Sequence, residues 1–360
     1  MRILQVITSF QTGGAETVVF NMIPRLCLLG YDVDLCLFNG IETPLTKKLS
    51  DYKNVKIHRL GCSYYNPLYI YKLIKIMRYY DVIHTHNSSP QLFAAIANLF
   101  CHKKLVTTEH STNNRKRKLP LFSYIDTWMY RQYNTIVCIS DIAEKKLKDY
   151  LGQNMRVANV CTIYNGVDVE ALRQALPIER KSIGSNKTKF VVVMVAGFRE
   201  AKDQSTLIRA IGRLSKEYIE LWLVGDGDRR GKLEQLVSDL GLQNIVKFLG
   251  IRMDVPNILK ASDVVVMSSH WEGLSLSNIE GMSVGKPFIA SDVDGLREMT
   301  QGAGLLFPHG DDKALADIIE QLYSDHQMYQ QVADACYQKA KQFDISKMVE
   351  QYDKLYRDLQ

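Results

Sequence analysis

Short apolar runs alternate with helix-length segments along the whole chain, and this alternation restricts the fold more than any other feature. The runs are rich in β-branched residues and almost continuously apolar, which is typical of parallel strands covered by helices on both faces. They predict strands at residues 2–8, 32–38, 55–59, 82–85, 104–108, 135–139, 190–196, 219–224, 245–249, 263–267 and 287–291. Amphipathic segments between them predict helices such as 15–29, 203–216, 230–240 and 311–324. The pattern indicates an α/β chain in which a doubly wound, Rossmann-like arrangement is present twice.

A change in composition divides the chain near its middle. The length of 360 residues exceeds one average domain, and the segment at 177–189 is polar and poor in large apolar residues. We therefore expect a first Rossmann-like domain at 1–168, a linker at 169–189 and a second Rossmann-like domain at 190–340. Two such domains form a cleft, and ligands in these folds bind beyond the carboxyl ends of the strands. Side chains that follow strands are therefore the candidates for a functional site.

Neither export nor membrane insertion is indicated by the sequence. The first apolar run, at residues 3–8, is too short for the core of a signal peptide, and no apolar run reaches the roughly 18 residues of a membrane span. The seven cysteines are scattered and include no C-x-x-C pair, which favours a reducing compartment over a disulfide or zinc framework. We expect a cytoplasmic protein.

Positive charge is concentrated in the first half of the chain. Residues 1–168 hold 21 Lys and Arg against 12 Asp and Glu, whereas the remaining residues hold 24 against 27. The basic residues gather at Lys72, Lys75 and Arg78, at Lys103 and Lys104, and in the run Arg115–Lys118. One interpretation is an ordinary solvated face; the other is a surface for an anionic membrane or acceptor, since each basic residue near a charged bilayer contributes about 1 kcal/mol. Nucleic acid is not indicated, because the chain has no recognisable binding motif and no basic-aromatic platform.

Two turns between a strand and a helix carry groups that suit phosphate. The turn SFQTGGAE after the first strand brings Gly13 and Gly14 to a helix N-terminus, where backbone amides can approach an anion. The turn AGFREAKD after the first strand of the second half brings Arg199 and Lys202 to another helix N-terminus. Two cations at such a position form a diphosphate clamp that needs no metal. The alternatives are a plain tight turn and a pair of solvated cations.

The acidic triplets of the chain do not predict a metal site. The segment LVGDGDRRG resembles a dinucleotide fingerprint but has Arg230 where G-x-G-x-x-G requires glycine. The D-x-D triplets that begin at Asp32, Asp226 and Asp292 have no histidine or further carboxylate arranged as a metal site. We therefore expect no metal requirement and no resident cofactor.

Two glutamates eight residues apart stand on a strand-to-helix turn, in the stretch HWEGLSLSNIE. Taken alone, Ser277 and Glu280 fit a capping box, in which Glu280 caps its helix. In that interpretation Glu272 is an ordinary loop carboxylate. The surrounding motifs favour a different one.

In their order and spacing, segments over residues 13–299 resemble the retaining nucleotide-sugar glycosyltransferases of family 4, which have the GT-B fold of two Rossmann-like domains facing a central cleft. Glu272 and Glu280 match the E-x7-E element of that family. The other matching segments are GGAE (13–16), HTHN (84–87), TTEHS (107–111), CIS (138–140), NGVD (165–168), AGFREAKD (196–203), LVGDGDRR (223–230), KFLGIRMDVPNILKASDVVVMSS (247–269) and EGLSLSNIEGMSVGKPFIASDVDGLREM (272–299).

The resemblance implies a reaction. We expect metal-independent transfer of a hexose from a nucleotide diphosphate sugar, with UDP as the most frequent nucleotide in the family. The acceptor would be a glycan or a lipid-linked glycan, as in polysaccharide biosynthesis, and the anomeric configuration would be retained. Retaining glycosidases use a carboxylate nucleophile, but no matching nucleophile is evident here. We expect front-face attack, in which the leaving phosphate assists deprotonation of the acceptor.

The resemblance also implies a role for each candidate residue. The catalytic residues would be His110, facing the donor sugar, and Glu272, positioning that sugar. The residues that would contact the donor are Gly13, Gly14, Arg199 and Lys202 at the diphosphate, Glu280 at the ribose, Glu272, Gly273, Leu274 and Ser275 at the sugar, and Gly250, Ile251 and Arg252 beside the base. His86 and Asn87 would lie on the acceptor side, and His84 would be structural.

The family's last helix often returns to the first domain, so we expect residues 341–360 to cross back to it. Two alternatives to an active glycosyltransferase stay open. One is a non-catalytic partner subunit of GT-B fold that binds a sugar nucleotide, and the complete set of candidate residues argues against it. The other is a GT-B relative such as an epimerase or a phosphorylase, which the E-x7-E element and the two phosphate cations disfavour. The basic first half would provide any peripheral contact with an anionic membrane.

Overall fold

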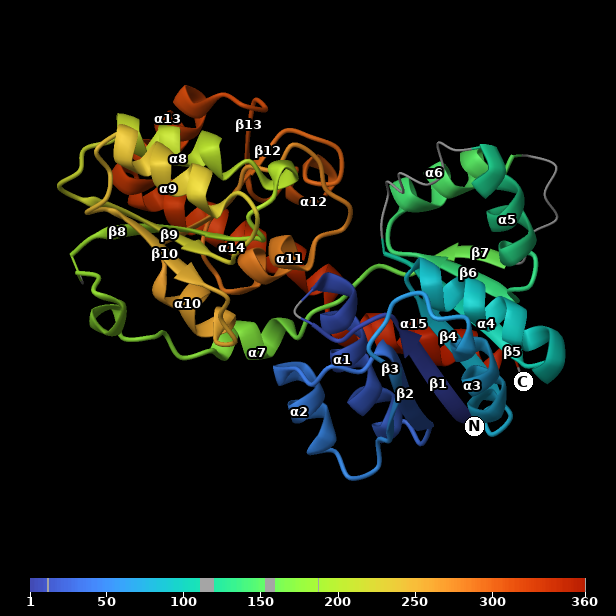
Figure 1. The fold of residues 1–360 in the computed structure, drawn as a ribbon. Helices are drawn as coiled ribbons and strands as arrows, with labels where there is room; N and C mark the ends of the chain where they lie inside the picture. Colours follow the sequence, from blue (N-terminus) through green and yellow to red (C-terminus); the bar gives the residue numbers. More distant parts are fainter. Residues whose placement is uncertain (12, 111–119, 153–158, 187, 360) are drawn as a thin grey trace. The chain divides into compact units, whose positions relative to one another are not determined.

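The computed structural model describes residues 1–11, 13–110, 120–152, 159–186 and 188–359, and Figure 1 shows its ribbon. The chain divides into two compact units. The first comprises Met1–Gly166 and Ile345–Gln360, and the second comprises Val167–Asp344. Each unit is built around one parallel β-sheet with helices on its faces, which is the α/β architecture that the sequence pattern predicts.

The sheet of the first unit has seven strands in the order β3-β2-β1-β4-β5-β6-β7, and all of these strands run parallel. The strands are β1 (Arg2–Ile7), β2 (Asp32–Asn39), β3 (Ile57–Gly61), β4 (Val82–His86), β5 (Lys104–Glu109), β6 (Thr135–Cys138) and β7 (Asn159–Thr162). The strand order reverses between β1 and β4. Ligands of doubly wound sheets bind where the strand order reverses, so the loops after β1 and β4 are the expected position of a ligand site in this unit.

The sheet of the second unit has six parallel strands in the order β10-β9-β8-β11-β12-β13. The strands are β8 (Phe190–Val195), β9 (Ile219–Val224), β10 (Val246–Gly250), β11 (Val264–Met267), β12 (Phe288–Ser291) and β13 (Leu305–Phe307). Here the order reverses between β8 and β11. The loops that follow these two strands carry the predicted phosphate cations and the first of the two glutamates.

Helices cover both sheets. Those of the first unit are α1 (Gly14–Leu28), α2 (Pro44–Ser50), α3 (Leu68–Met77), α4 (Ser88–Cys101), α5 (Pro120–Tyr130), α6 (Asp141–Leu151) and α15 (Ile345–Arg357). Those of the second unit are α7 (Val169–Gln174), α8 (Gln204–Arg213), α9 (Arg230–Asp239), α10 (Val255–Ala261), α11 (Leu276–Ser283), α12 (Arg297–Thr300), α13 (Asp312–Ser324) and α14 (His326–Ala340), with 3₁₀ turns at Arg180–Ile183, Glu200–Lys202 and Lys341–Phe343. In the second unit α8 packs against α9 and α13, while α11 packs against α7 and α14.

The predicted linker is not a free connection in the structure. Arg180, in the polar segment 177–189, donates hydrogen bonds of 2.8 Å to the carbonyl of Ala261 and 2.7 Å to that of Lys189. Its guanidinium also forms an ion pair with Asp263 at 2.8 Å. These contacts attach the segment to the amino end of β11, so it belongs to the second unit. The polar composition of this segment predicted a linker. Sequence alone does not show that the Arg180 guanidinium donates to carbonyl groups of the second unit.

The last helix packs within the first unit. Tyr352 and Tyr356 of α15 are almost wholly buried, and the ring of Tyr356 meets that of Tyr31 edge-on with centroids 6.0 Å apart. Burying an aromatic side chain contributes about 1.5–3 kcal/mol, so two such anchors hold α15 firmly against the sheet. No helix among the described residues is long and apolar enough to cross a membrane.

Candidate active site

The loop after β8 and the loop after β11 bring a cation and a carboxylate together. Lys202 Nζ forms an ion pair with Glu272 Oε1, and Ser269 Oγ donates a 2.7 Å hydrogen bond to the same oxygen. The Lys202 side chain is 22% exposed and that of Glu272 9%, so the pair is largely shielded from water. Lys202 was predicted to bind diphosphate and Glu272 a sugar, and the structure places the two groups in direct contact.

Arg199 lies three residues before Lys202 and is exposed. Among the described residues its guanidinium has no acidic partner within ion-pair distance, whereas Lys202 is paired. Asp203, which follows Lys202, caps α8 by accepting hydrogen bonds from the amide and hydroxyl of Thr206 at 3.3 and 2.6 Å. Its φ of 44° is in the left-handed region. Strained backbone of this kind often marks a site where side chains are held for function.

The GDG turn after β9 supports the Arg199 loop. The Phe198 amide donates to the carbonyl of Asp226 at 2.9 Å, and the Arg229 amide donates to the carbonyl of Phe198 at 3.1 Å. A Cβ at Gly227 would lie 2.5 Å from the Phe198 carbonyl oxygen. The segment that resembles a dinucleotide fingerprint therefore owes its glycines to close packing of two loops.

This packing yields a stability prediction. Gly227→Ala is expected to destabilise the protein by about 1–3 kcal/mol, because the added methyl group overlaps backbone that cannot move away cheaply. Gly231→Ala is the matched control, since a Cβ there meets nothing within 4 Å. Alanine inside helix α9 should stabilise it by about 0.5–1 kcal/mol. Chemical denaturation of both variants checks the pair, and equal effects would contradict the packing argument.

Glu280 lies in α11, and its carboxylate accepts no hydrogen bond from any of the described residues. Burial raises the pKa of Glu280 to about 7. The capping-box alternative does not hold, because α11 begins at Leu276 and Ser277 lies within the helix. The side chain is part-buried and has no protein donor among the described residues, so its carboxylate is suited to an external donor such as a hydroxyl group.

The loop from Gly273 to Ser275 connects the two glutamates. Its start is packed tightly against Gly295, whose φ is 85° and whose Cβ, if present, would lie 2.3 Å from the carbonyl oxygen of Glu272. The Gly295 amide donates a 2.6 Å hydrogen bond to the Glu298 carboxylate. Sequence reasoning did not single out Gly295. Its positive φ and its contact with the loop explain why glycine stands there.

Gly250, Ile251 and Arg252 leave the end of β10. Gly250 has a φ of 66°, and its carbonyl accepts a 2.9 Å hydrogen bond from the Gly225 amide. Arg252 is held by a two-pronged pair with the Asp254 carboxylate at 2.8 and 2.6 Å. Ile251 is 64% exposed. Of the three, Ile251 offers the apolar surface that a flat base could contact.

In the first unit, the candidate residues follow β1, β4 and β5. Gly13 precedes α1 and Gly14 is its first residue, so amides at this N-terminus lack helical acceptors. A Cβ at Gly13 would lie 2.4 Å from Glu16 Oε2. Asn87, between β4 and α4, has a φ of 72° and ψ of 157°, a strained combination for a residue other than glycine.

His110 and His86 are in contact. His86 Nδ1 lies 2.9 Å from His110 Nε2, and His86 Nε2 lies 2.8 Å from Gln5 Oε1. His86 is wholly buried. Both of its ring nitrogens are thus engaged within the protein, and its acceptor-side role stays a prediction. Among the described residues, His110 Nδ1 has no hydrogen-bond partner.

His84 is buried in the same group of side chains. Its Nδ1 lies 2.6 Å from the Tyr356 hydroxyl and its Nε2 lies 2.8 Å from Thr108 Oγ1. Both contacts are internal, as befits the structural role that was expected for it. The histidines are linked by Gln5 and Tyr356. The sequence did not predict these two residues as part of the site, because no motif indicates that residues 351 positions apart are neighbours.

One group in the described residues has the composition of a metal site. His270 Nδ1 lies 2.6 Å from His309 Nε2 and 3.8 Å from Asp203 Oδ2. Two nitrogens on one tetrahedral zinc ion would be about 3.3 Å apart, given bonds of about 2.0–2.1 Å. The observed distance is that of a hydrogen bond between the rings, and the Asp203 oxygens serve the cap of α8. The arrangement is therefore not a preformed metal centre.

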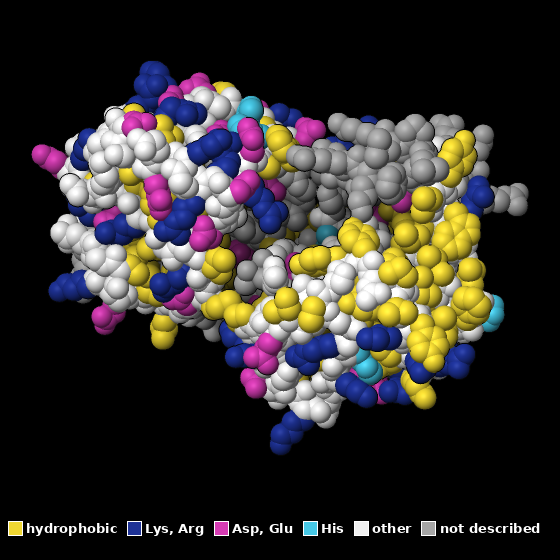
Figure 2. Space-filling model, viewed as in Figure 1, with side chains coloured by type: hydrophobic (Ala, Val, Ile, Leu, Met, Phe, Trp, Pro, Cys, Tyr) yellow, Lys and Arg dark blue, Asp and Glu magenta, His cyan; other side chains and the backbone are white. Residues whose placement is uncertain are grey.

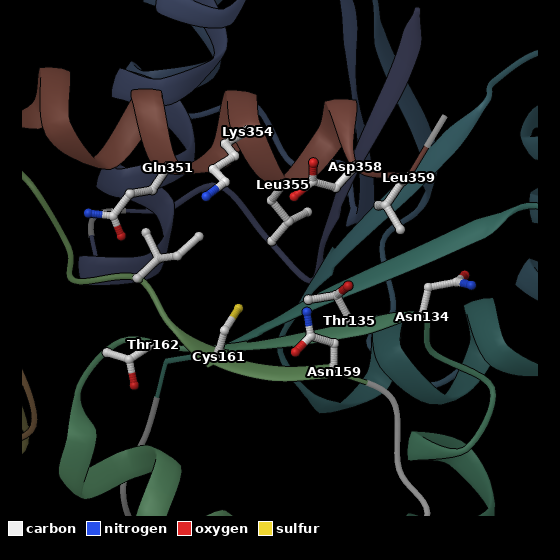
Figure 3. Close-up of a pocket in the computed structure, with 11 residues that line it drawn as sticks. Asn134, Thr135, Asn159, Cys161, Thr162, Gln351, Lys354, Leu355, Asp358 and Leu359 are labelled. Carbon is white, nitrogen blue, oxygen red and sulfur yellow. The ribbon is translucent and has the colours of Figure 1, made fainter.

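A pocket of about 470 Å³ lies between α15 and the strands β6 and β7 (Figure 3). Side chains of α15 point toward those of β7 across it. It is lined by Asn134, Thr135, Asn159, Cys161, Thr162, Ile163, Gln351, Lys354, Leu355, Asp358 and Leu359. None of the predicted site residues is among them, so this pocket is separate from the candidate site.

Comparisons with known proteins agree with this description. The sequence model described as Glycosyltransferase Family 4 matches residues 12–171, and the one described as Glycosyl transferases group 1 matches residues 177–342. The chain is 25% identical to N-acetyl-alpha-D-glucosaminyl L-malate synthase of Bacillus anthracis, over 96% of this chain and 94% of that protein. It is 27% identical to the UDP-Gal:alpha-D-GlcNAc-diphosphoundecaprenol alpha-1,3-galactosyltransferase of Escherichia coli, over 81% and 78% of the two chains.

Solved structures show the same fold. The structure of Anabaena Alr3699/HepE in complex with UDP and glucose superposes with a TM-score of 0.87, at 23% identity, over 99% of this chain and all of that one. The sucrose-phosphate synthase of Thermosynechococcus elongatus superposes with a TM-score of 0.82 at 20% identity, over 100% and 99%. Both units and nearly the whole length are thus accounted for by one fold and one family. The chain is a glycosyltransferase with the GT-B fold, and it belongs to glycosyltransferase family 4.

Proposed function

We propose that this enzyme transfers a hexose from a UDP-sugar to a glycan or lipid-linked glycan, with retention of configuration and without a metal ion. The observation that carries the proposal is Glu280, a part-buried carboxylate to which no described residue donates a hydrogen bond. It lies eight residues after Glu272, which pairs with Lys202. A carboxylate can accept hydrogen bonds from both hydroxyls of a ribose. The similar Anabaena protein was solved with UDP and with UDP-glucose, which supports UDP as the nucleotide.

The second unit supplies the donor-binding groups of this proposal. Arg199 is exposed and free to bind diphosphate, and Lys202 adds a second positive charge where the leaving group forms. Fixed positive charge stabilises the negative charge that develops on a leaving phosphate. Glu272, held by Lys202 and Ser269, positions the donor sugar. The leaving phosphate then assists removal of the proton from the acceptor hydroxyl during front-face attack.

The first unit supplies the remaining groups. The amides at the start of α1 suit an anion, and His110 presents a ring nitrogen without a partner among the described residues. We assign this nitrogen to a hydroxyl of a substrate sugar. We assign a glycan or lipid-linked glycan as the acceptor because the similar protein from Escherichia coli is named for transfer of galactose to alpha-D-GlcNAc-diphosphoundecaprenol.

A binding and turnover experiment tests the proposal. The full chain is heated with UDP, GDP, ADP and their glucose conjugates, in EDTA and in magnesium, because a ligand of the folded state raises the unfolding temperature. Stabilisation by UDP that is equal in EDTA and magnesium is expected. Incubation with UDP-glucose should then release UDP as the glucosyl group passes to an added glycan acceptor or, more slowly, to water. Stabilisation without release of UDP would favour the non-catalytic subunit, and release only with metal would overturn metal independence.

A surface on α3, the loop before it, α4 and α5 favours a peripheral membrane location. Exposed apolar side chains gather there, as Figure 2 shows over the region of these helices, and they include Tyr64, Tyr65, Leu68, Tyr71, Leu99, Phe100, Tyr124 and Trp128. Lys72 and Lys75 are interspersed, and Lys75 Nζ lies 4.4 Å from the centre of the Tyr71 ring. Apolar and aromatic side chains mixed with lysine suit the interface of an anionic bilayer. The basic run Arg115–Lys118 lies outside the described residues.

The membrane assignment makes a direct prediction. The full chain should sediment with vesicles of phosphatidylglycerol and phosphatidylcholine but not with phosphatidylcholine alone. Changing Leu68 and Phe100, which are 68% and 64% exposed, to serine should weaken binding at least about tenfold, given about 1.5–3 kcal/mol for each buried apolar side chain. Leu176→Ser in the second unit, where Leu176 is 78% exposed, is the control. Equal losses in both variants would contradict this surface.

A further inference from the structure

A continuous chain of hydrogen bonds runs through the interior of the first unit. It connects His110 to His86, His86 to Gln5, Gln5 to Tyr356 and Tyr356 to His84, with lengths of 2.9, 2.8, 3.1 and 2.6 Å. Gln5 is on β1, the histidines are on or beside β4 and β5, and Tyr356 is on α15. Every member except His110 has no exposed surface. Of these side chains the proposed function uses only His110, and it gives no role to the other members of the hydrogen-bonded chain.

The direction of the hydrogen bonds follows from Gln5. Its Nε2 donates to the Tyr356 hydroxyl oxygen, and its Oε1 can only accept, so His86 Nε2 must carry a proton. A neutral imidazole has one N–H, so His86 Nδ1 is an acceptor. His110 Nε2 must then donate to it. His110 Nδ1 is left without a proton and, among the described residues, without a partner.

The three rings are neutral, as this argument requires. Burial lowers the pKa of His110 to about 4. Burial, together with repulsion from a protonated His110, lowers the pKa of His84 to about 3. Burial also lowers the pKa of His86 well below its usual value, with the other two histidines contributing. Near neutral pH each ring therefore has one proton, and the hydrogen bonds decide which nitrogen holds it.

We propose that Gln5, held by Tyr356 of the C-terminal helix, is a positioning residue that fixes the tautomer of His110 through His86. His110 then presents an unprotonated Nδ1, which accepts a hydrogen bond from a hydroxyl group and cannot donate one. The inference rests on the proposed function for the identity of that hydroxyl, which belongs to a substrate sugar. It assigns a role to residues at both ends of the chain, and to a helix that follows the whole second unit.

The opposite orientation of the Gln5 amide would reverse every donor in the chain and place the proton on His110 Nδ1. The two cases differ in a measurable way. In the full chain labelled with ¹⁵N at its histidine rings, two-dimensional NMR distinguishes protonated from unprotonated ring nitrogens, and His110→Gln identifies the His110 signals. We expect Nε2 to be protonated and Nδ1 unprotonated. A proton on Nδ1 overturns the proposal whatever the activity shows.

Variants test whether Gln5 sets the tautomer. Gln5→Met keeps the length of the side chain and removes both polar atoms, so both tautomers of His110 should become populated. Tyr356→Phe, which frees the Gln5 amide to rotate, should have the same effect and is the second variant if Gln5→Met does not fold. Tyr133→Phe is the control, because Tyr133 is also buried but bonds to Thr85 and to the Gln91 carbonyl. An unchanged His110 tautomer in Gln5→Met and Tyr356→Phe overturns the proposal.

Kinetics separate this proposal from the proposed function. In Gln5→Met, kcat should fall at least about tenfold, within the range of a misplaced proton-transfer or hydrogen-bonding group. The affinity for UDP should change less than about twofold, because Gln5 bonds to Tyr356 and His86, and the proposed function assigns neither of them to the nucleotide. A changed tautomer with unchanged kcat would support the positioning of His110 and remove His110 from the transfer step. No release of UDP by the wild type, with the expected tautomer, would count against the proposed function alone.

Discussion

Replacing Glu280 by glutamine is expected to weaken UDP binding about 10- to 100-fold and to raise the thermal stability of the ligand-free protein at pH 8. Hydrogen bonds to a charged group contribute about 1.5–3 kcal/mol, and each 1.4 kcal/mol is tenfold in affinity. A carboxylate has two oxygens that accept hydrogen bonds, whereas the glutamine amide has only one. Isothermal titration with UDP measures the first effect, and thermal unfolding measures the second.

The stability effect follows from the pKa of Glu280. Burial raises this pKa from 4.5 to about 7, so the folded protein holds the proton more tightly than the unfolded chain does. Ionisation between pH 4.5 and about 7 therefore removes stability from the folded state. Above pH 7 the wild type contains a shielded carboxylate that the glutamine variant lacks. The two proteins should be equally stable below pH 4.5 and differ most above pH 7.

The same titration affects binding. If the ionised carboxylate accepts hydrogen bonds from the ribose hydroxyls, the UDP affinity of the wild type should fall as the pH is lowered from 8 to 6. The affinity is compared with that of the glutamine variant at each pH. This comparison also corrects for the titration of UDP itself. Glu234→Gln, on the exposed face of α9 in the same unit, is the control for removing one negative charge. Equal UDP affinity of wild type and Glu280→Gln would show that this carboxylate does not bind the nucleotide.

The sequence predicted the elements whose pattern is local. All eleven predicted strands occur, because short apolar runs bounded by turn residues have few other solutions. The edge strands β7 and β13 were missed. They have four and three residues, and pairing on one side only needs no long apolar run. The strand β3 lies two residues later than predicted, in a segment where polar and apolar residues give no sharp boundary.

The candidate site likewise has residues that the sequence predicted and contacts that it could not predict. Arg199, Lys202, Glu272 and Glu280 could be named from sequence because they lie in two short motifs. Their relation could not: the pairing of Lys202 with Glu272 depends on loops from β8 and β11 that meet only in the fold. The hydrogen bonds that surround His110 depend on α15, more than 230 residues later in the chain. Long-range contacts of this kind leave no periodicity or motif in a single sequence.

Lys202→Met is expected to lower kcat about 100- to 1,000-fold, the usual effect of removing one group that stabilises developing charge. In the ligand-free protein Lys202 neutralises Glu272, so the variant also leaves that carboxylate with Ser269 as its one remaining donor among the described residues. Lys202 and Glu272 should therefore behave as a unit. Removing both should cost much less than the two single changes together, since directly contacting residues couple by about 0.5–3 kcal/mol.

A double-mutant cycle measures this coupling. Lys202→Met, Glu272→Gln and the double variant are compared for kcat and for UDP affinity, with Arg199→Met as the matched control. Arg199 has no acidic partner among the described residues, so Arg199→Met and Glu272→Gln should be additive. Additive effects of Lys202→Met and Glu272→Gln would mean that the pair seen in the ligand-free protein separates before the sugar is transferred. Coupling confined to kcat would show that the pair acts in the transition state. There Glu272 holds the sugar while Lys202 stabilises the negative charge on the departing phosphate.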